Sequence, residues 1–186
     1  MTSVGREPLE HRLTQRDLDC TPDDGNRYEI IDGRLYVTPF PTYAHQQAVT
    51  QLVTLLNNHV RQNRTGRVFA AGLKVVLDEP SGIGPDVVFV STARMVDMQA
   101  DGYYGAPDLV VEVLSSKPEL DRFVKLHKYA DAGVAHYWIV DAAGRTLSAY
   151  RLEAGRYALA WEGEGDATFE PELFRGLRID LAELWV

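Results

Sequence analysis

Two acidic side chains stand at apolar segments and could take part in chemistry together. Asp86 opens the run DVVFV, and Glu112 lies inside PDLVVEVLS. An unpaired charge in such an apolar run is costly. The 26 positions between the two acids allow each to project from one of two neighbouring strands. There they would repel each other and raise each other's pKa, unless a divalent metal ion lay between them.

Magnesium is the ion that such a pair favours, because it prefers oxygen ligands and binds through one or two carboxylates while keeping several waters. Manganese could substitute for it. An ion of this kind polarises a phosphate and activates water, as the hydrolysis of a phosphodiester requires. Asp86 and Glu112 are therefore predicted to be magnesium ligands.

A fixed positive charge near the phosphate would complete such a site, and the segment after Glu112 offers Lys125 and Lys128. Asp121 and Lys125 are four residues apart, so they share one face of a helix. Helical side chains lean toward the N-terminus, which lets Lys125 reach back toward the strand ends before its helix. Lys74 and Lys128 remain substitutes for this role.

The elements that must position these residues begin with a hairpin and a helix. RYEIIDGRLYVTP predicts two short strands joined at Asp32-Gly33, with Glu29 in the first strand. PTYAHQQAVTQLVTLLNNHVRQ has the period of an amphipathic helix, and Pro41 and Thr42 mark its start.

Three apolar stretches then predict strands, since each is short, β-branched and bounded by glycine or proline. They are VFAAGLKVVL, PDVVFV and PDLVVEVL. Residues 115–133 predict a second helix, with capping-box spacing between Ser116 and Glu119 and a stop at Gly133. Residues 136–163 predict a meander of three strands, and the end of the chain predicts a strand followed by a helical turn.

This order of elements predicts an α/β or α+β fold, with a mixed central sheet flanked by helices and an extra C-terminal β-meander. We expect one domain over residues 1–186, with a polar leader over 1–25 and the C-terminal strands within 136–186.

The composition bounds the function. A single cysteine, Cys20, and the absence of a signal-type start or a long apolar run predict a cytoplasmic protein without a membrane segment. The net charge of -8 argues against nonspecific coating of nucleic acid. Residues 61–130, with nine basic and nine acidic side chains, are where a phosphate-facing surface is expected.

Five segments in this order resemble the Uma-type proteins, a bacterial group of restriction-endonuclease-like nucleases within the PD-(D/E)xK superfamily. The segments are YEIIDGRL, PTYAHQ, PDVVFV, PDLVVEVLS and KLHKYADAGVAHYWIVD, and the tail FRGLRIDLAELW is also similar. The likeness covers most of the chain, and it implies a restriction-endonuclease-like fold and hydrolysis of DNA with magnesium.

The resemblance also implies roles for single residues. Asp86 matches the superfamily's PD aspartate and Glu112 its second acid. The usual lysine two positions later is replaced by Leu114, and Lys125 matches the lysine that takes its place on the following helix. Glu29 becomes a candidate accessory acid and His45 a residue lining the site.

One departure from the family pattern is His136, which stands where many relatives have glutamate. It weakens the inference of a shared substrate and leaves the proposed metal site untouched.

Plainer interpretations of the acids stay open. Asp86 could cap a turn, and Glu112 could pair with Lys74, Lys117 or Lys125. Asp108 shares a strand face with Glu112 and could be the true first acid, although such a residue more often caps the start of a strand.

The other candidates have plainer interpretations too. Lys125 alone would more often be a solvated helix lysine, and His45 a polar residue at a helix start. Glu29 is expected to pair with Arg27 or Arg34 around its hairpin more readily than to act in catalysis.

The favoured function is a magnesium-dependent endonuclease acting on DNA, which could act as a homodimer because two strands need two sites. One alternative is a catalytically idle nuclease fold that binds nucleic acid or protein. The other is a phosphoesterase acting on small nucleotides.

Overall fold

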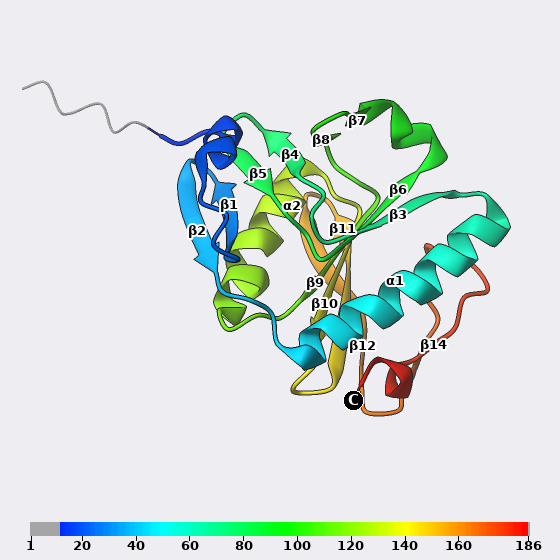
Figure 1. Ribbon diagram of the computed structural model, residues 1–186. Coiled ribbons are helices and arrows are strands. Elements are labelled where there is room, and N and C mark those ends of the chain that lie inside the picture. The colour runs from blue at the N-terminus through cyan, green and yellow to red at the C-terminus, as the bar shows by residue number, and fades with distance from the viewer. Residues whose placement is uncertain (1–11, 186) are drawn as a thin grey trace, which may run out of the picture.

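The computed structural model describes residues 12–185 and contains two six-stranded sheets (Figure 1). The first sheet has the order β2-β1-β5-β4-β8-β7. Its strands are β1 (Arg27–Ile31), β2 (Arg34–Thr38), β4 (Val75–Asp78), β5 (Ser81–Ile83), β7 (Met98–Gln99) and β8 (Gly102–Tyr104).

The second sheet has the order β12-β11-β10-β9-β6-β3, and its neighbouring strands are antiparallel except for the parallel pair β9 and β10. Its strands are β3 (Gly66–Ala70), β6 (Val87–Ser91), β9 (Leu109–Val113), β10 (His136–Asp141), β11 (Thr146–Glu153) and β12 (Arg156–Glu164). A separate short pair joins β13 (Thr168–Phe169) to β14 (Ile179–Asp180).

The helical elements pack against both sheets. They are α1 (Tyr43–Asn63), α2 (Leu126–Ala132), the π-helical turn η3 (Leu120–Lys125) that runs into α2, and the 3-10 turns η1 (Gln15–Cys20), η2 (Thr92–Asp97) and η4 (Leu181–Leu184). None of the helices among residues 12–185 has the length and apolar character that a membrane-spanning helix needs.

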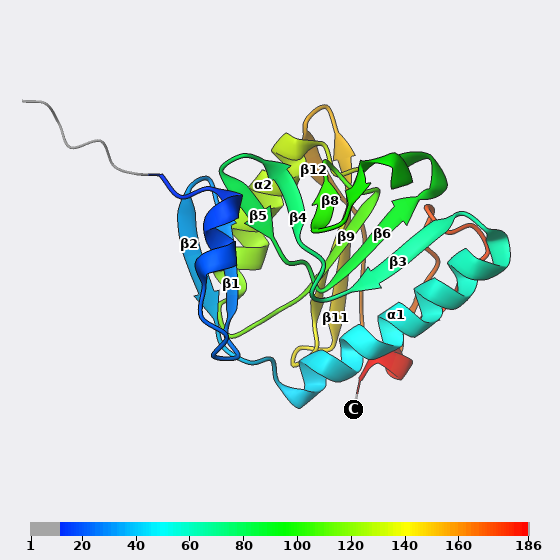
Figure 2. The same cartoon turned by 45° about the horizontal axis from the view of Figure 1, so that its top comes forward.

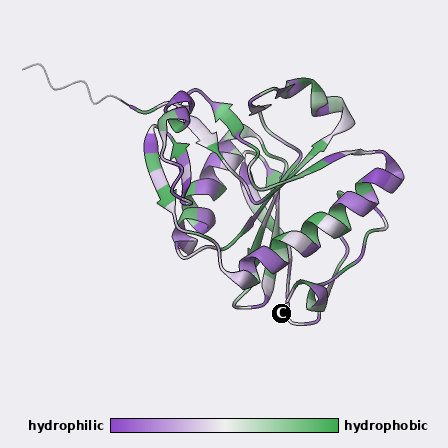
Figure 3. Ribbon diagram, in the orientation of Figure 1, coloured by the Kyte–Doolittle hydropathy of each residue, from purple (hydrophilic) through white to green (hydrophobic). Residues whose placement is uncertain are grey.

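Helix α1 lies across one face of the second sheet (Figure 2). Thr42 caps it by accepting a hydrogen bond from the His45 backbone N–H at 3.2 Å, as the sequence predicts. Its buried side chains, among them Leu52 and Leu56, join Trp138 of β10 in one core cluster. Hydrophobic and hydrophilic bands alternate along the helix in Figure 3, the pattern of a helix with one covered face.

The segment formed by η3 and α2 lies between the two sheets. Leu120 and Tyr129 of this segment share a core cluster with Ile31 and Ile83 of the first sheet and Tyr137 of the second. Side chains from this segment can therefore meet side chains from both sheets.

Two turns confirm the predicted hairpin and meander. Asp32 and Gly33 between β1 and β2 have φ angles of 50° and 77°, the left-handed pair that a two-residue hairpin turn needs. Ala154 and Gly155 join β11 to β12 in the same way, with φ angles of 48° and 79°. The predicted strand and helical turn at the end of the chain are β14 and η4.

The predicted fold class is confirmed, with corrections of detail. The strands form two large sheets where one central sheet was expected. The stretch VFAAGLKVVL is not one strand, because it breaks at Gly72, whose φ of 106° interrupts an extended chain. The helix after Glu112 begins with a π-helical turn, and Glu119 stands at its start without a capping hydrogen bond from its side chain.

The predicted polar leader is also corrected in part. Residues 1–11 lie outside the described residues, but Gln15 opens η1 with its side chain buried against the first sheet.

Candidate active site

Asp86 lies just before β6 and is held by three hydrogen bonds. Its Oδ1 accepts from Nη2 of Arg27 at 2.7 Å, and its Oδ2 from the backbone N–H of Val113 at 2.9 Å. The second oxygen also meets Nε2 of His45 at 3.1 Å. Val113 is the last residue of β9 and directly follows Glu112, so this contact fixes Asp86 beside the end of β9.

Glu112 points from β9 toward η3 and α2 and is buried. Its Oε1 accepts a hydrogen bond from the Tyr129 hydroxyl at 2.8 Å and lies 3.1 Å from Nζ of Lys125. The carboxylate is therefore met inside its apolar strand by a cation and a hydroxyl group, both from the following helical segment.

Lys125 connects three acids from different elements. Its Nζ lies 3.0 Å from Oε1 of Glu29, 3.1 Å from Oε1 of Glu112 and 3.4 Å from Oδ1 of Asp121. Lys125 ends the π-helical turn η3, and such turns are frequent at functional sites. The predicted i to i+4 pairing of Asp121 with Lys125 is confirmed.

Glu29 is placed differently from the hairpin pairing favoured above. Its Oε1 accepts a hydrogen bond from the Gly84 backbone N–H at 3.0 Å and pairs with Lys125. Arg27, two residues earlier on the same face of β1, pairs instead with Asp86. Both side chains of this strand therefore point into the buried site.

These charged groups form one cluster, called the acid cluster below. It comprises Glu29, Asp86, Glu112, Asp121, Arg27 and Lys125. Four carboxyl groups thus face two fixed cations, an excess of two acids. A buried cluster with more acids than cations favours keeping a proton on one of its carboxyl groups.

The pKa shifts follow from this excess. Burial, together with the nearby charge of Asp86, raises the pKa of Glu112 to about 8, against the opposing charge of Lys125. Burial would raise the pKa of Asp86 too, but the His45 hydrogen bond and the Arg27 charge lower it to about 2. Burial opposes the charge on Lys125, yet Glu112 and Glu29 hold its pKa above the ordinary value.

The acid cluster fits a divalent cation in charge and in donor type. With all four carboxyl groups ionised, the excess of two negative charges matches one such ion, and carboxylate oxygens are the ligands that magnesium prefers. Within residues 12–185, however, no three acid, histidine or cysteine side chains converge in the geometry of a metal site. The ammonium of Lys125 lies between the carboxylates of Glu29 and Glu112 instead.

Several sequence candidates lie outside the acid cluster. Asp108 caps the opposite end of β9, where its Oδ2 accepts from the Ser91 backbone N–H at 2.7 Å and its Oδ1 lies 3.5 Å from Nε of Arg94. Lys128 pairs with Asp32 and Asp78.

The two remaining lysines are also engaged elsewhere. Lys74 bonds Gln15 and Asp101, and Lys117 donates to the Val37 carbonyl. Of the lysines considered, Lys125 is the one brought to Glu112.

Sequence reasoning missed two residues of the site. Arg27 was interpreted as a partner of Glu29, and nothing in its spacing shows that it meets Asp86, 59 positions away. Tyr129 is four residues after Lys125, so helical spacing could have placed its hydroxyl on the same face.

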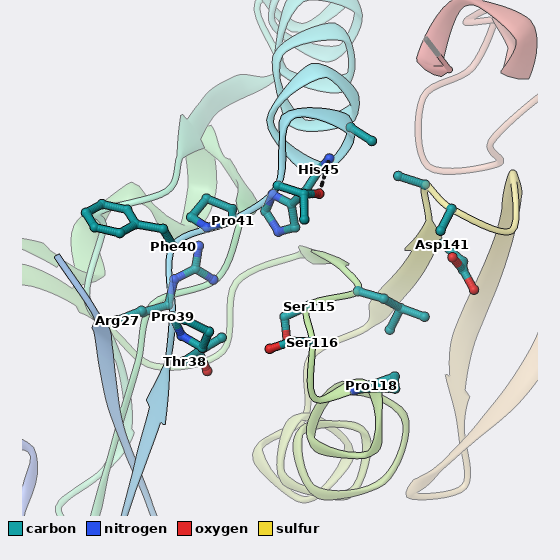
Figure 4. Close-up of a pocket in the computed structure, with 15 residues that line it drawn as sticks. Arg27, Thr38, Pro39, Phe40, Pro41, His45, Ser115, Ser116, Pro118 and Asp141 are labelled. Carbon is teal, nitrogen blue, oxygen red and sulfur yellow. Dashed lines mark hydrogen bonds between the residues drawn. The ribbon is translucent and has the colours of Figure 1, made fainter.

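A cavity of about 310 Å³ opens beside the acid cluster (Figure 4). Arg27 and His45, both bonded to Asp86, line it on one side. Figure 4 shows Ser115, Ser116 and Pro118 on the opposite side, from the loop between β9 and η3. This pocket, called the Arg27 pocket below, gives a ligand access to the neighbourhood of Asp86.

The fold and the buried acid–lysine cluster define a restriction-endonuclease-like protein. The model of the Uma2 family, described as "Putative restriction endonuclease", matches residues 15–182. The chain belongs to the Uma2 family, which confirms the resemblance drawn from the sequence.

A solved structure has the same fold. It is described as that of a "putative nuclease belonging to DUF820" from Anabaena variabilis, and it matches with a TM-score of 0.73 at 20% sequence identity. The match covers 92% of this chain and 97% of that chain. None of the curated proteins compared with the chain matches it.

Proposed function

We propose that this chain is a metal-dependent endonuclease that hydrolyses phosphodiester bonds of DNA. The observation that carries the proposal is the acid cluster, in which carboxylates from both sheets and one buried lysine meet beside an open pocket. Membership of a family described as restriction endonucleases supports the same reaction class.

Asp86 and Glu112 would hold a magnesium ion, with Glu29 as an accessory acid. Such an ion supplies a Lewis acid for the phosphate and lowers the pKa of water. Glu112 must lose its proton to act as a ligand, since metal ligands are deprotonated. Arg27 and His45 fix the orientation of Asp86, and the Tyr129 hydroxyl fixes Glu112.

Lys125 is proposed to stabilise the charge that develops on the phosphate and to orient the attacking water. Its ammonium is already held close to Glu112 and Glu29. If these carboxylates held the metal ion, the ammonium would be available to donate toward the substrate. No covalent bond between enzyme and substrate is needed.

The direct test is the nicking of supercoiled plasmid with magnesium or manganese. Asp86→Asn and Glu112→Gln should each lower the rate by at least about a hundredfold, since each loses a charged ligand. Asp78→Asn is the matched control, because Asp78 is a strand acid paired with a lysine outside the acid cluster. Equal rates in all three variants would contradict the proposal.

A catalytically idle binding module is the second candidate. The position of Lys125 between two carboxylates favours it, because a permanent ammonium can satisfy buried acids without any metal. This candidate predicts that DNA is retained in EDTA by the Glu112→Gln variant and that no metal produces nicking.

A further inference from the structure

The Arg27 pocket has one cation among the residues that line it. Arg27 sends Nη2 to Asp86 at 2.7 Å, and within residues 12–185 its other guanidinium nitrogens have no hydrogen-bond partner. Its side chain is 27% exposed. A phosphate group entering the pocket would therefore meet a guanidinium anchored to a proposed metal ligand and still able to donate.

An exposed aromatic ring stands at the same pocket. Phe40 lines it and is 74% exposed, and Tyr43, three residues later at the start of α1, is 72% exposed. Among the described residues, Phe123 is the only other exposed phenylalanine, tyrosine or tryptophan. Of these three rings, Phe40 is the one that lines the pocket.

Phe40 is held in place by its contact with the backbone. A Cβ atom built on Gly25 would lie 2.0 Å from the ring, so the ring rests directly on this glycine. Gly25 has a φ of 82°, which a glycine adopts without strain. The end of the ring thus lies against the chain at Gly25, while most of the side chain stays open to solvent.

A polar atom in the pocket wall also lacks a partner. His45 is buried and bonds Asp86 through Nε2, which carries the proton because an ionised carboxylate can only accept. Within the described part of the chain, its Nδ1 is the one buried side-chain nitrogen or oxygen without a hydrogen-bond partner.

These features favour an unpaired strand over a duplex. Duplex binding relies on neutralising many phosphates along two backbones, whereas this pocket offers a single arginine and the chain carries a net charge of -8. Proteins that bind single strands combine a few cations with aromatic rings on which bases stack. The volume of about 310 Å³ is at the small end of ligand sites.

We propose that the Arg27 pocket binds one unpaired nucleotide, with its phosphate on Arg27 and its base on Phe40, so that the substrate is single-stranded or locally unpaired DNA. This inference rests on the proposed endonuclease function and names its substrate class. Arg27 and Phe40 are then residues that position the strand beside the acid cluster.

The test is fluorescence anisotropy in EDTA with a labelled oligonucleotide of about twelve nucleotides, a length typical of such sites. The same sequence is presented as a single strand and as a blunt duplex. We expect the wild-type protein to bind the single strand about tenfold more tightly. Phe40→Ala and Arg27→Met should each weaken that binding about tenfold, while Phe40→Trp should keep it.

Matched controls come from the same chain. Phe123→Ala removes an exposed phenylalanine outside the pocket, and Arg178→Met removes a surface arginine paired with Glu170. Both should bind the single strand as wild type does. Thermal unfolding of every variant shows whether it is folded.

Three results would overturn the inference: equal affinity for the two DNA forms, undiminished binding by Phe40→Ala, or no binding at all. Its failure is distinguishable from failure of the proposed function. Metal-dependent nicking with equal affinity for both forms keeps the endonuclease and removes the unpaired nucleotide. Single-strand binding that depends on Phe40, without nicking under any metal, keeps the unpaired-nucleotide site and removes the endonuclease.

Discussion

Lys125 and Lys128 lie three residues apart on one helical segment, and each bridges two or more carboxylates. Lys125 joins carboxylates of both sheets, whereas Lys128 joins Asp32 and Asp78 of the first sheet and its hairpin turn. The side chain of Lys125 is 2% exposed and its partners Glu29 and Glu112 are each 1% exposed. Lys128 is 8% exposed, but its partners Asp32 and Asp78 are 67% and 45% exposed.

The difference shows that pairing a lysine with two acids does not by itself define a site. Around Lys128, water shares the solvation of both carboxylates, so the ion pairs contribute little. Around Lys125, desolvation raises the energy of every charge, and the acids outnumber the cations. Burial with an excess of acid is what sets the Lys125 group apart from the Lys128 group, and it supports the proposed divalent-cation site.

The largest effect is expected from removing the buried lysine. Lys125→Met should lower the free energy of unfolding by about 3–5 kcal/mol at pH 7, because buried carboxylates lose their cation. It should also abolish nicking. Urea unfolding in EDTA and the plasmid assay measure the two effects. A loss of stability below about 1 kcal/mol would show that the two lysine clusters do not differ.

An intermediate effect is expected from pH. The pKa of Glu112 is raised from 4.5 to about 8 in the folded protein, so the folded state holds the proton that the unfolded state loses. The contribution of Glu112 to the free energy of unfolding should therefore be greatest below about pH 4.5. Between about pH 4.5 and 8 it should fall by up to about 1.4 kcal/mol per pH unit.

The matched variant for this pH dependence is Glu112→Gln. It cannot ionise, so its unfolding free energy in EDTA should lack that decline between about pH 4.5 and 8. Urea unfolding across this range measures both proteins. Parallel curves for wild type and variant would mean that Glu112 is ionised throughout.

The smallest effect is expected from the exposed pairs. Lys128→Met should change the free energy of unfolding by less than about 1 kcal/mol and leave nicking unchanged, because its partners remain solvated. The same urea and plasmid assays apply. A loss of activity comparable with that of Lys125→Met would make Lys128 part of the catalytic site.

Local elements of the fold were predictable because their signals are local. The Thr42 cap, the Asp32-Gly33 turn and the stop at Gly133 each depend on a few neighbouring residues, and all three are found. The division of the strands into two sheets was not predictable, because it depends on pairings between distant segments such as β1 with β5.

The residues of the site also separate into those that the sequence predicts and those that depend on contacts between distant segments. Glu112 stands out as an acid inside an apolar strand and Asp86 as an acid directly before one, and the pairing of Asp121 with Lys125 follows from helical spacing. The contact of Arg27 with Asp86 depends on how the hairpin folds over the second sheet, and no spacing in the sequence encodes that. Glu29 was misassigned to a hairpin pair for the same reason.

The most direct test of the central claim is calorimetric titration of the protein with manganese at pH 7, in two buffers of different ionisation enthalpy. We expect one site and the release of about one proton per ion, because Glu112 must be deprotonated to bind the metal. Both the binding and the proton release should be lost in Glu112→Gln. Absence of binding to the wild-type protein, or unchanged binding to Glu112→Gln, would contradict the claim that the acid cluster holds a divalent cation.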